Sequence, residues 1–362
     1  MRERIVVAMS GGVDSSVAAA LLKRQGYEVI GITMCFNLTD STRRRPNCCG
    51  IQGIEDARRV AHKLGIKHYV VNMQKVLGEK VIKNFLQEYL NGRTPNPCVR
   101  CNQYIKFDAL LKKAHSLGAK FLATGHYARI IKTHHSTTFT THHYLLKKAK
   151  DKTKDQSYFL YCLGQEQLRH TIFPLGNYTK DEVRKLAREF DLPVADKLAS
   201  QEICFLPNAD YRRFIKMQDK NADIKPGLIV DTQGRVLGQH KGIPFYTVGQ
   251  RQGLGIAKGY PLYITRINPK NNRITVGKKE DVYKSEFLVK DAHFILKPPK
   301  KKIAVRVRIR YNHKEAPGQV MPWRNKIKVN FRKPQFAITP GQSAVFYDKD
   351  RVLGGGIIDR VK

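Results

Sequence analysis

A heptad near the N-terminus, Ser10-Gly11-Gly12-Val13-Asp14-Ser15-Ser16, constrains the fold of this 362-residue chain more than any other feature. The heptad follows the apolar run Ile5–Met9, and it leads into Val13–Gln25, which is rich in alanine and leucine. Paired glycines between a buried strand and a helix let the backbone turn tightly and present N–H groups, to which the serines add hydroxyl donors. The pattern therefore predicts a phosphate-binding loop inside a strand–turn–helix unit.

The rest of the first half alternates strand and helix patterns. Strands are predicted at Glu28–Met34, His68–Asn72 and Lys120–Thr124, and helices at Ile54–Leu64, Val76–Leu90 and Ile105–Ser116. Thr179 and Glu182 are spaced as a capping box that begins a further helix, Thr179–Phe190. Strands that alternate with helices of this length give an α/β fold with a parallel sheet covered on both faces.

The composition changes after about Phe205. Glycine and proline then separate short apolar runs, which indicates a small β-rich module. From Tyr283 onward the pattern has period two, with Val305, Val307 and Ile309 on one face and Arg306, Arg308 and Arg310 on the other. We expect an antiparallel sheet with one cationic face, closed into a small barrel.

The net charge of +36, from 66 Lys+Arg and 30 Asp+Glu, favours a polyanionic partner such as nucleic acid. The segment 283–362 alone holds 19 Lys/Arg and 6 Asp/Glu. No apolar stretch approaches the ~18 residues of a transmembrane helix, and the first apolar run is too short for a signal peptide, so we expect a cytoplasmic protein without membrane contact. Seven cysteines are too few for a disulfide scaffold in a chain of this length.

Neither a Walker loop nor a dinucleotide fingerprint is present, because the chain has no GxxxxGK[ST] or GxGxxG pattern at the first helix. The heptad instead resembles the PP-loop of ATP pyrophosphatases, which split ATP between the α and β phosphates and adenylate a substrate. Asp14 is suited to hold Mg²⁺ that bridges the pyrophosphate, because carboxylates are hard oxygen ligands.

Further motifs narrow the resemblance. They are TPNPCVRCN from Thr94, ATGHYA from Ala123, KDQSYFL from Lys154, SQEICF from Ser200, GQR from Gly249, RIRY from Arg308 and GQSAVFY from Gly341. Together and in this order they resemble the bacterial tRNA-specific 2-thiouridylase (MnmA) family over essentially the whole chain. The resemblance implies a PP-loop (adenine nucleotide alpha hydrolase-like) catalytic domain at 1–204, a small β-rich central domain at 205–282 and a basic, tRNA-binding β-barrel at 283–362.

The same resemblance implies a reaction. Enzymes of this family convert the wobble uridine of tRNA to 2-thiouridine, with tRNAs of the Lys, Glu and Gln type as expected substrates. Adenylation of the uracil C2 oxygen by ATP releases pyrophosphate and makes AMP the leaving group, and a sulfur nucleophile then attacks C2. The expected partner besides tRNA is a sulfur-relay protein or a cysteine desulfurase.

Site residues follow from the resemblance. The cysteine matching Cys204 carries a persulfide, the one matching Cys101 is the second catalytic cysteine, and the two can form a disulfide as sulfur is released. The positions that match ATP-binding residues are Ala8, Met9, Ser10, Gly11, Gly12, Val13, Asp14, Ser15, Met34 and Gly125. The positions that match tRNA contacts are His126, Lys154, Asp155, Gln156, Arg310, Tyr311 and Gln342.

Cys98 departs from the commoner pattern, in which many members carry a proposed acid/base Asp. Cys98, Cys101 and Cys204 are three thiolates, enough to hold a four-iron four-sulfur cluster with one open iron. Persulfide chemistry, a CxxC redox pair and a zinc site completed by Cys48 and Cys49 are the alternatives. Cys35 and Cys162 lie in apolar runs and are predicted to belong to the core.

Two other functions remain open at this point. An adenylating PP-loop ligase that makes an amide from ammonia would need neither the cysteine pair nor the basic barrel. In a non-catalytic RNA-binding protein, the cysteines would bind a stabilising zinc ion and the loop would be vestigial. Tests of tRNA-independent ATP/pyrophosphate exchange and of metal content separate these two readings from a tRNA thiolase.

Overall fold

The structure is a computed structural model that describes residues 2–36, 51–133, 143–198, 203–206, 210–218 and 224–362. It contains two compact units, each of which is described by itself. The first comprises Met1–Val81, Cys98–Ala209 and Asp350–Val352, and the second comprises Ile82–Pro97, Asp210–Lys349 and Leu353–Lys362. Among the residues that are described, no helix is long and apolar enough to cross a membrane.

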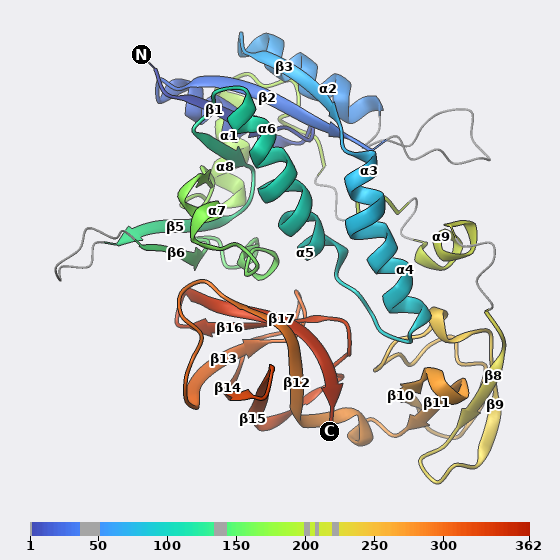
Figure 1. Ribbon diagram of the computed structural model, residues 1–362. Coiled ribbons are helices and arrows are strands. Elements are labelled where there is room, and N and C mark those ends of the chain that lie inside the picture. The colour runs from blue at the N-terminus through green and yellow to red at the C-terminus, as the bar shows by residue number, and fades with distance from the viewer. Residues whose placement is uncertain (1, 37–50, 134–142, 199–202, 207–209, 219–223) are drawn as a thin grey trace. The chain divides into compact units, whose positions relative to one another are not determined.

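A five-stranded parallel sheet forms the centre of the first unit, with strand order β3-β2-β1-β4-β7 (Figure 1). Its strands are β1 (Arg4–Ala8), β2 (Glu28–Cys35), β3 (Lys67–Asn72), β4 (Phe121–Thr124) and β7 (Thr171–Ile172). A hairpin of β5 (Ala128–Thr133) and β6 (His143–Lys148) follows β4. The predicted α/β architecture is confirmed.

The helices of the first unit alternate with these strands. They are α1 (Val13–Arg24), α2 (Ile51–Lys63), α3 (Gln74–Leu77), α5 (Pro97–Cys101), α6 (Leu111–Ser116), α7 (Gln165–Arg169) and α8 (Lys180–Glu189). Helix α1 is rich in small apolar residues, which lets it pack closely, and its core-facing side chains form one cluster with Val183 and Ala187 of α8. The Thr179 hydroxyl accepts from the Glu182 N–H at 3.2 Å, so the predicted capping box begins α8.

The helix predicted at Ile105–Ser116 begins earlier than the sequence pattern indicated. Pro97 starts α5, a π-helical stretch (Asn102–Leu110) follows, and α6 ends the run. Proline is favoured in the first turn because it has no N–H to leave unpaired. Both cysteines of the CxxC pair therefore lie in a helical turn. The helix predicted at Val76–Leu90 is likewise α3, a π-helical stretch (Gly78–Ile82) and α4 (Lys83–Leu90).

The second unit holds two β structures, helix α4 and helix α9 (Tyr211–Gln218). A four-stranded sheet with order β10-β11-β8-β9 consists of β8 (Gly227–Val230), β9 (Val236–His240), β10 (Tyr263–Asn268) and β11 (Arg273–Gly277). Its core includes Ile229, Phe245, Ile264 and Val276. This sheet is the small β-rich module that the glycine and proline punctuation predicted.

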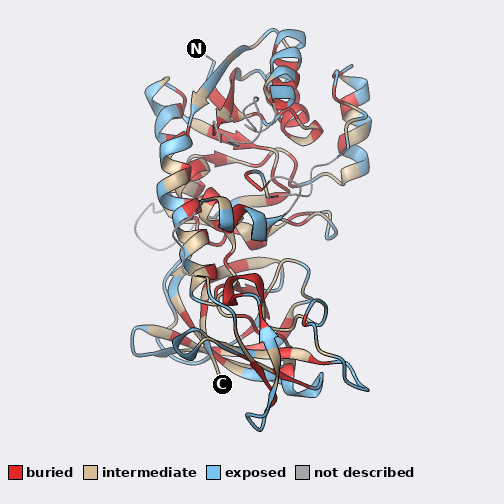
Figure 2. Ribbon diagram, turned by 90° about the vertical axis from the view of Figure 1, so that its right-hand side faces the viewer, coloured by how far each residue is buried: buried red, intermediate tan, exposed pale blue. Residues whose placement is uncertain are grey.

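Six antiparallel strands form a closed barrel in the order β12-β15-β14-β13-β16-β17, with β12 paired to β17 (Figure 1). They are β12 (Tyr283–Phe294), β13 (Ile303–Arg308), β14 (Ala316–Trp323), β15 (Lys326–Phe336), β16 (Ser343–Asp348) and β17 (Arg351–Val361). The predicted alternation is confirmed, because Val305, Val307 and Ile309 are buried in the barrel core while Arg306 is exposed. Figure 2 shows that buried residues are interspersed with intermediate and exposed ones along the strands.

The outward-facing cations of the barrel are partly neutralised by acidic neighbours. The Lys326 ammonium lies 2.8 Å from Asp359, and the Lys328 ammonium lies 2.7 Å from Glu286. The Arg306 guanidinium lies 3.7 Å from the Glu315 carboxylate. Cross-strand pairs of opposite charge stabilise a sheet modestly, so part of this cationic face has a structural role.

Candidate active site

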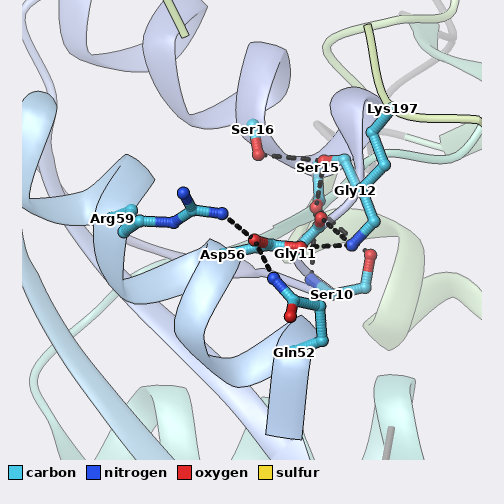
Figure 3. A network of polar contacts seen from close by, with 9 residues as sticks. All are labelled: Ser10, Gly11, Gly12, Ser15, Ser16, Gln52, Asp56, Arg59 and Lys197. Carbon is cyan, nitrogen blue, oxygen red and sulfur yellow. Dashed lines mark hydrogen bonds and ion pairs between the residues drawn. The ribbon is translucent and has the colours of Figure 1, made fainter. Parts of the chain in front are cut away.

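The predicted phosphate loop, residues 10–16, is braced by its own serines (Figure 3). Ser15 Oγ accepts from the Ser10 N–H at 3.2 Å and donates to the Gly12 carbonyl at 3.1 Å, and Ser16 Oγ donates to that same carbonyl at 2.9 Å. The sequence predicted these hydroxyls as phosphate donors, whereas here they stabilise the turn into α1.

Glycine is required at position 11. Gly11 has a φ of +71°, in the left-handed region that side chains disfavour. A Cβ atom there would lie 2.2 Å from the carbonyl oxygen of Gly53, in the first turns of α2. The backbones of the loop and of α2 therefore touch. Gly12 has a φ of −99°, and the nearest atom to a Cβ placed there would be Ser10 Oγ at 3.4 Å.

Asp14 is held by two residues that the sequence analysis did not identify. Its Oδ1 accepts from the Lys180 ammonium at 2.6 Å and from the Tyr127 hydroxyl at 2.7 Å. The Lys180 side chain is only 12% exposed. Burial raises the pKa of the Tyr127 hydroxyl, and the charge of Asp14 and the hydrogen bond to it raise that pKa further, so Tyr127 remains a donor. The capping box of α8 was the one sequence signal that located Lys180, as the first residue of a helix.

The other predicted nucleotide positions outside the loop lie at or next to the carboxyl ends of β1, β2 and β4. Ala8 ends β1, Met9 is buried and donates its N–H to Ile32 at 2.8 Å, and Met34 lies near the end of β2. A Cβ atom on Gly125 would lie 2.7 Å from the Ser15 nitrogen, so the chain just after β4 packs directly against the loop.

Cys98 and Cys101 lie one helical turn apart in α5. Burial raises the pKa of the Cys98 thiol to about 11, the neighbouring Cys101 adds to the rise, and the ammonium of Lys106 opposes it. Burial also raises the pKa of the Cys101 thiol, again against the charge of Lys106. Both thiols are therefore protonated at neutral pH in this arrangement.

His126 connects the cysteine helix to β4. Its Nε2 lies 3.4 Å from the Lys106 ammonium and its Nδ1 lies 2.7 Å from the Thr124 hydroxyl. Burial and the charge of Lys106 hold the pKa of the imidazole well below its usual value, so the ring is neutral. Because an ammonium can only donate, Nε2 is the acceptor and Nδ1–H donates to Thr124. Both ring nitrogens of this predicted tRNA contact are thus engaged inside the fold.

The remaining cysteines differ in environment. Cys35 is buried at the end of β2, as predicted for a core residue. Cys162 donates to the Val99 carbonyl at 3.9 Å, so it packs against α5 in a turn and not in a strand, and burial raises the pKa of its thiol to about 12. Cys204 is exposed. Cys48 and Cys49 lie outside the described residues.

The sequence allowed a metal cluster on Cys98, Cys101 and Cys204. Within the described part of the chain, which includes all three, no group of three or more His, Cys, Asp or Glu side chains is arranged to hold a metal ion. The described arrangement therefore does not fit a three-cysteine cluster.

The predicted tRNA contacts of the first unit, apart from His126, lie between β6 and α7. Asp155 is buried and accepts from the Ser157 hydroxyl at 2.9 Å and from the Ala149 N–H at 3.1 Å. Gln156 Oε1 accepts from the Tyr127 N–H at 3.0 Å. Lys154, beside them, is partly exposed. These contacts give Asp155 and Gln156 a structural role, and their contact with tRNA stays a prediction.

In the second unit, Arg310 donates to the Phe336 carbonyl at 2.8 Å, and Tyr311, next to it, is partly exposed. Gln342 Nε2 donates to the carbonyls of Thr94 and Pro95 at 3.0 and 3.1 Å. Gln342 thereby fixes the segment that leads to the CxxC pair. For these residues, too, contact with tRNA stays a prediction.

Comparison with known families gives matches along the whole chain. The family described as tRNA methyl transferase HUP domain matches residues 3–208, the tRNA methyl transferase PRC-barrel domain matches residues 213–278, and the aminomethyltransferase beta-barrel domain matches residues 284–358.

Similar proteins carry a consistent name. The chain is 53% identical over 365 residues to tRNA-specific 2-thiouridylase MnmA 1 of Caldanaerobacter subterraneus subsp. tengcongensis, covering 99% of both chains. It is 49% identical to tRNA-specific 2-thiouridylase MnmA of Clostridium acetobutylicum, covering 99% of this chain and 100% of that one. Among solved structures, a 4-thiouridine synthetase–RNA complex with bound ATP has a TM-score of 0.34 at 16% identity and covers 61% of this chain and 51% of that chain, a likeness too distant to support an argument.

Proposed function

The chain belongs to the family of tRNA-specific 2-thiouridylases, and on that premise we propose that it adenylates the C2 oxygen of the tRNA wobble uridine and replaces that oxygen with sulfur from a cysteine persulfide. The reaction requires an ATP-binding loop and sulfur-bearing cysteines that act on one base.

One observation carries this proposal. The segment Thr124–Tyr127, which begins with the last residue of β4, contacts both candidate sites in the first unit. Gly125 packs against the backbone of Asp14 and Ser15, and the Tyr127 hydroxyl donates to Asp14. Between them, His126 contacts Lys106, which lies on the helical run that carries Cys98 and Cys101. A shared segment of four residues suits a reaction in which a base activated at the phosphate loop meets a cysteine.

In the adenylation step, the C2 oxygen attacks the α-phosphorus of ATP and pyrophosphate leaves. The loop N–H groups and the positive end of α1 would stabilise the phosphates. The Lys180 ammonium donates to Asp14 beside the loop. It would compensate the charge that develops on the leaving pyrophosphate. We propose Ala8, Met9, Ser10, Gly11, Gly12, Val13, Asp14, Ser15, Met34 and Gly125 as the nucleotide-binding positions.

In the sulfur step, the terminal sulfur of a Cys204 persulfide attacks C2, and AMP leaves with the former C2 oxygen. The Cys101 thiol, which is protonated in the described arrangement, must first lose its proton to solvent. The resulting thiolate attacks the Cys204 sulfur, which breaks the S–S bond to the transferred sulfur and leaves 2-thiouridine. A Cys101–Cys204 disulfide forms, and a cellular dithiol supplies the two electrons that reduce it. Exposure of Cys204 suits loading by a sulfur-relay protein or a cysteine desulfurase. We propose Cys98, at the place of the commoner Asp, as the third cysteine of the site.

The proposed cofactors differ in how well the residues suit them. Mg²⁺ is commonly held by one or two carboxylates plus substrate phosphates, and Asp14 can supply one carboxylate, so we propose it as the Mg²⁺-holding residue. When bound, Mg²⁺ would neutralise charge on the pyrophosphate. The iron–sulfur alternative lacks a gathered ligand set among the described residues, so the proposed route includes no step through a cluster.

The proposed macromolecular substrate is tRNA with a wobble uridine, of the Lys, Glu and Gln type. The net charge of +36 and the partly exposed Lys154 and Tyr311 support contact with a polyanion. We place the reaction in the cytosol, where a reducing environment keeps the cysteines available.

The decisive experiment incubates anaerobically prepared protein with tRNA, ATP, Mg²⁺ and a persulfide donor, and measures 2-thiouridine by mass spectrometry together with the iron content. We expect thiolation by iron-free protein, and AMP formation that depends on tRNA. Activity that appears only with about four irons per chain would replace the persulfide route by a cluster route. ATP/pyrophosphate exchange without tRNA would favour the amide-forming ligase, and zinc without any AMP formation would favour a non-catalytic RNA-binding protein.

A further inference from the structure

An ion pair between a buried carboxylate and a partly exposed ammonium lies beside the loop of residues 10–16, on the side where α2 begins (Figure 3). The Lys197 ammonium contacts the Asp56 carboxylate, and it also donates to the Gly11 carbonyl at 3.1 Å. Asp56 lies on α2, less than one turn after Gly53, whose backbone touches Gly11. Lys197 belongs to the segment that follows α8. Three separate parts of the sequence therefore meet at the loop.

Asp56 is not an ordinary surface carboxylate, because its side chain is only 3% exposed. It also accepts from the Gln52 amide at 3.0 Å and from the Arg59 guanidinium. Burial alone would raise the pKa of the carboxyl, but hydrogen bonds from Lys197, Arg59 and Gln52 outweigh burial and hold that pKa below its usual value. The Asp56 carboxylate therefore stays charged at neutral pH, and it fixes the position of the Lys197 side chain.

The contact with Gly11 has a geometric consequence. In a trans peptide the carbonyl and the following N–H point in opposite directions. When Lys197 holds the Gly11 carbonyl on the α2 side, the Gly12 N–H must point away from α2. Gly11 has no side chain to restrain its left-handed backbone, so this hydrogen bond is an added restraint at the most adaptable residue of the loop.

We propose that Lys197 is a positioning residue for the phosphate loop, clamped by Asp56 so that it fixes the Gly11–Gly12 peptide in the orientation that receives a nucleotide phosphate. This role rests on the proposed use of ATP by the loop. Lys197 acts through the backbone and need not touch ATP.

The chain offers a matched control for a merely structural ion pair. The Lys63 ammonium pairs with Asp191, and this pair also joins α2 to the segment after α8. Its members are 47% and 86% exposed, and the hydrogen bonds recorded for Lys63 do not include the loop. Loss of Lys63 therefore removes a comparable link between the same two elements and leaves Gly11 untouched.

The test compares Lys197→Met, Lys197→Arg and Lys63→Met in the full chain. Binding of a non-hydrolysable ATP analogue is measured by calorimetry, and KM and kcat for ATP are measured by tRNA-dependent AMP formation. We expect Lys197→Met to weaken analogue binding and raise KM for ATP by about tenfold or more, as loss of a charged hydrogen bond would. The KM for tRNA should not change. Lys197→Arg should restore most of the ATP affinity. Lys63→Met should have the same analogue affinity and the same KM for ATP as the wild type.

The outcomes separate this inference from the proposed function. If the wild-type protein does not bind the analogue, the proposed function fails. If the wild type binds it and Lys197→Met binds it equally well, the positioning role is wrong. If Lys197→Met does not fold, Asp56→Asn releases the ammonium while keeping the shape of the side chain. An unchanged KM for ATP in folded Asp56→Asn protein would also overturn the role, and a raised one would support it.

Discussion

The Lys180 ammonium lies 2.6 Å from Oδ1 of Asp14, although 166 residues separate the two in the sequence. Asp14 belongs to the turn into α1, and Lys180 begins α8. The contact brings a cation to the anion-binding end of a helix, where the backbone N–H groups of α1 already favour negative charge. The carboxylate therefore positions a lysine at the loop in addition to its proposed role toward Mg²⁺.

Asp14→Asn should abolish AMP formation while leaving folding and tRNA binding nearly intact, because it removes a charge from the site and nothing from the core. Lys180→Met should reduce kcat for AMP formation at least a hundredfold, since pyrophosphate loses its proposed counter-charge. The kcat of the double variant should be no lower than that of the less active single variant, as expected for residues that act as a unit. Lys185→Met, on the exposed side of the same helix, is the control. Normal turnover by Asp14→Asn would remove Asp14 from the site.

Substitutions of the paired glycines should have unequal effects. Gly11→Ala places a methyl group within 2.2 Å of the Gly53 carbonyl on a residue with φ +71°, so we expect a large loss of ATP binding and a lower melting temperature. Gly12→Ala fits an ordinary backbone region, and its nearest neighbour lies at 3.4 Å. The melting temperature of the Gly12→Ala variant should stay near that of the wild type. Equal melting temperatures for the two variants, measured by calorimetry, would contradict the described loop.

The protonated thiols of Cys98 and Cys101 should react slowly in the absence of tRNA. With the pKa of Cys98 near 11 and that of Cys101 also raised, little thiolate exists at pH 7, so iodoacetamide should label Cys204 first. Labelling of Cys98 and Cys101, followed by peptide mass spectrometry, should increase steadily from pH 8 to pH 10.

Lys106→Met should suppress this labelling further. Its positive charge lowers both thiol pKa values, so its loss raises them and reduces the thiolate at any fixed pH. Lys112→Met, whose ammonium pairs with Asp108 on the same helical run, should leave the labelling profile unchanged. Labelling of Cys101 as fast as Cys204 at pH 7 would argue against a buried, protonated pair.

Substitutions of the arginines in β13 and in the turn after it should differ in their effects on tRNA binding and on the free energy of unfolding. Arg306 is half exposed, and its hydrogen bond to the Glu315 carbonyl at 2.7 Å is exposed too. Arg306→Gln should therefore weaken binding to all tRNA species and reduce the salt dependence of the binding constant by about 0.7–0.9 in log–log slope, with little loss of stability. Arg308 donates to the Tyr311 carbonyl and Arg310 donates to the Phe336 carbonyl. Their Gln variants should additionally lose about 1–3 kcal/mol of unfolding free energy. Filter binding over a salt series and denaturant titration measure the two effects, and an unchanged slope for all three would mean that none contacts phosphate.

Local pattern was sufficient to predict the architecture. The period-two alternation of Val305, Val307 and Ile309 predicted a half-buried strand, and the spacing of Thr179 and Glu182 predicted where α8 begins, because both depend on neighbours within a few residues. The heptad identified the loop for the same reason. The start of the cysteine helix was missed, since the rigid Pro97 and a π-helical stretch do not give a 3.6-residue apolar period.

Sequence by itself determined the strand–loop–helix unit, the β-rich second half and the family motifs. Tertiary structure alone decided that Lys180 and Tyr127 meet Asp14, and that Lys197 and Asp56 meet Gly11. It also decided that the Cys98 and Cys101 thiols have raised pKa values near the charge of Lys106, and that the side chains of Asp155 and Gln342 form hydrogen bonds with backbone groups. The physical reason is that hydrogen bonds and pKa shifts act over a few ångströms. The chain brings such partners together from distant positions, 248 residues apart for Gln342 and Thr94, and no local pattern encodes this.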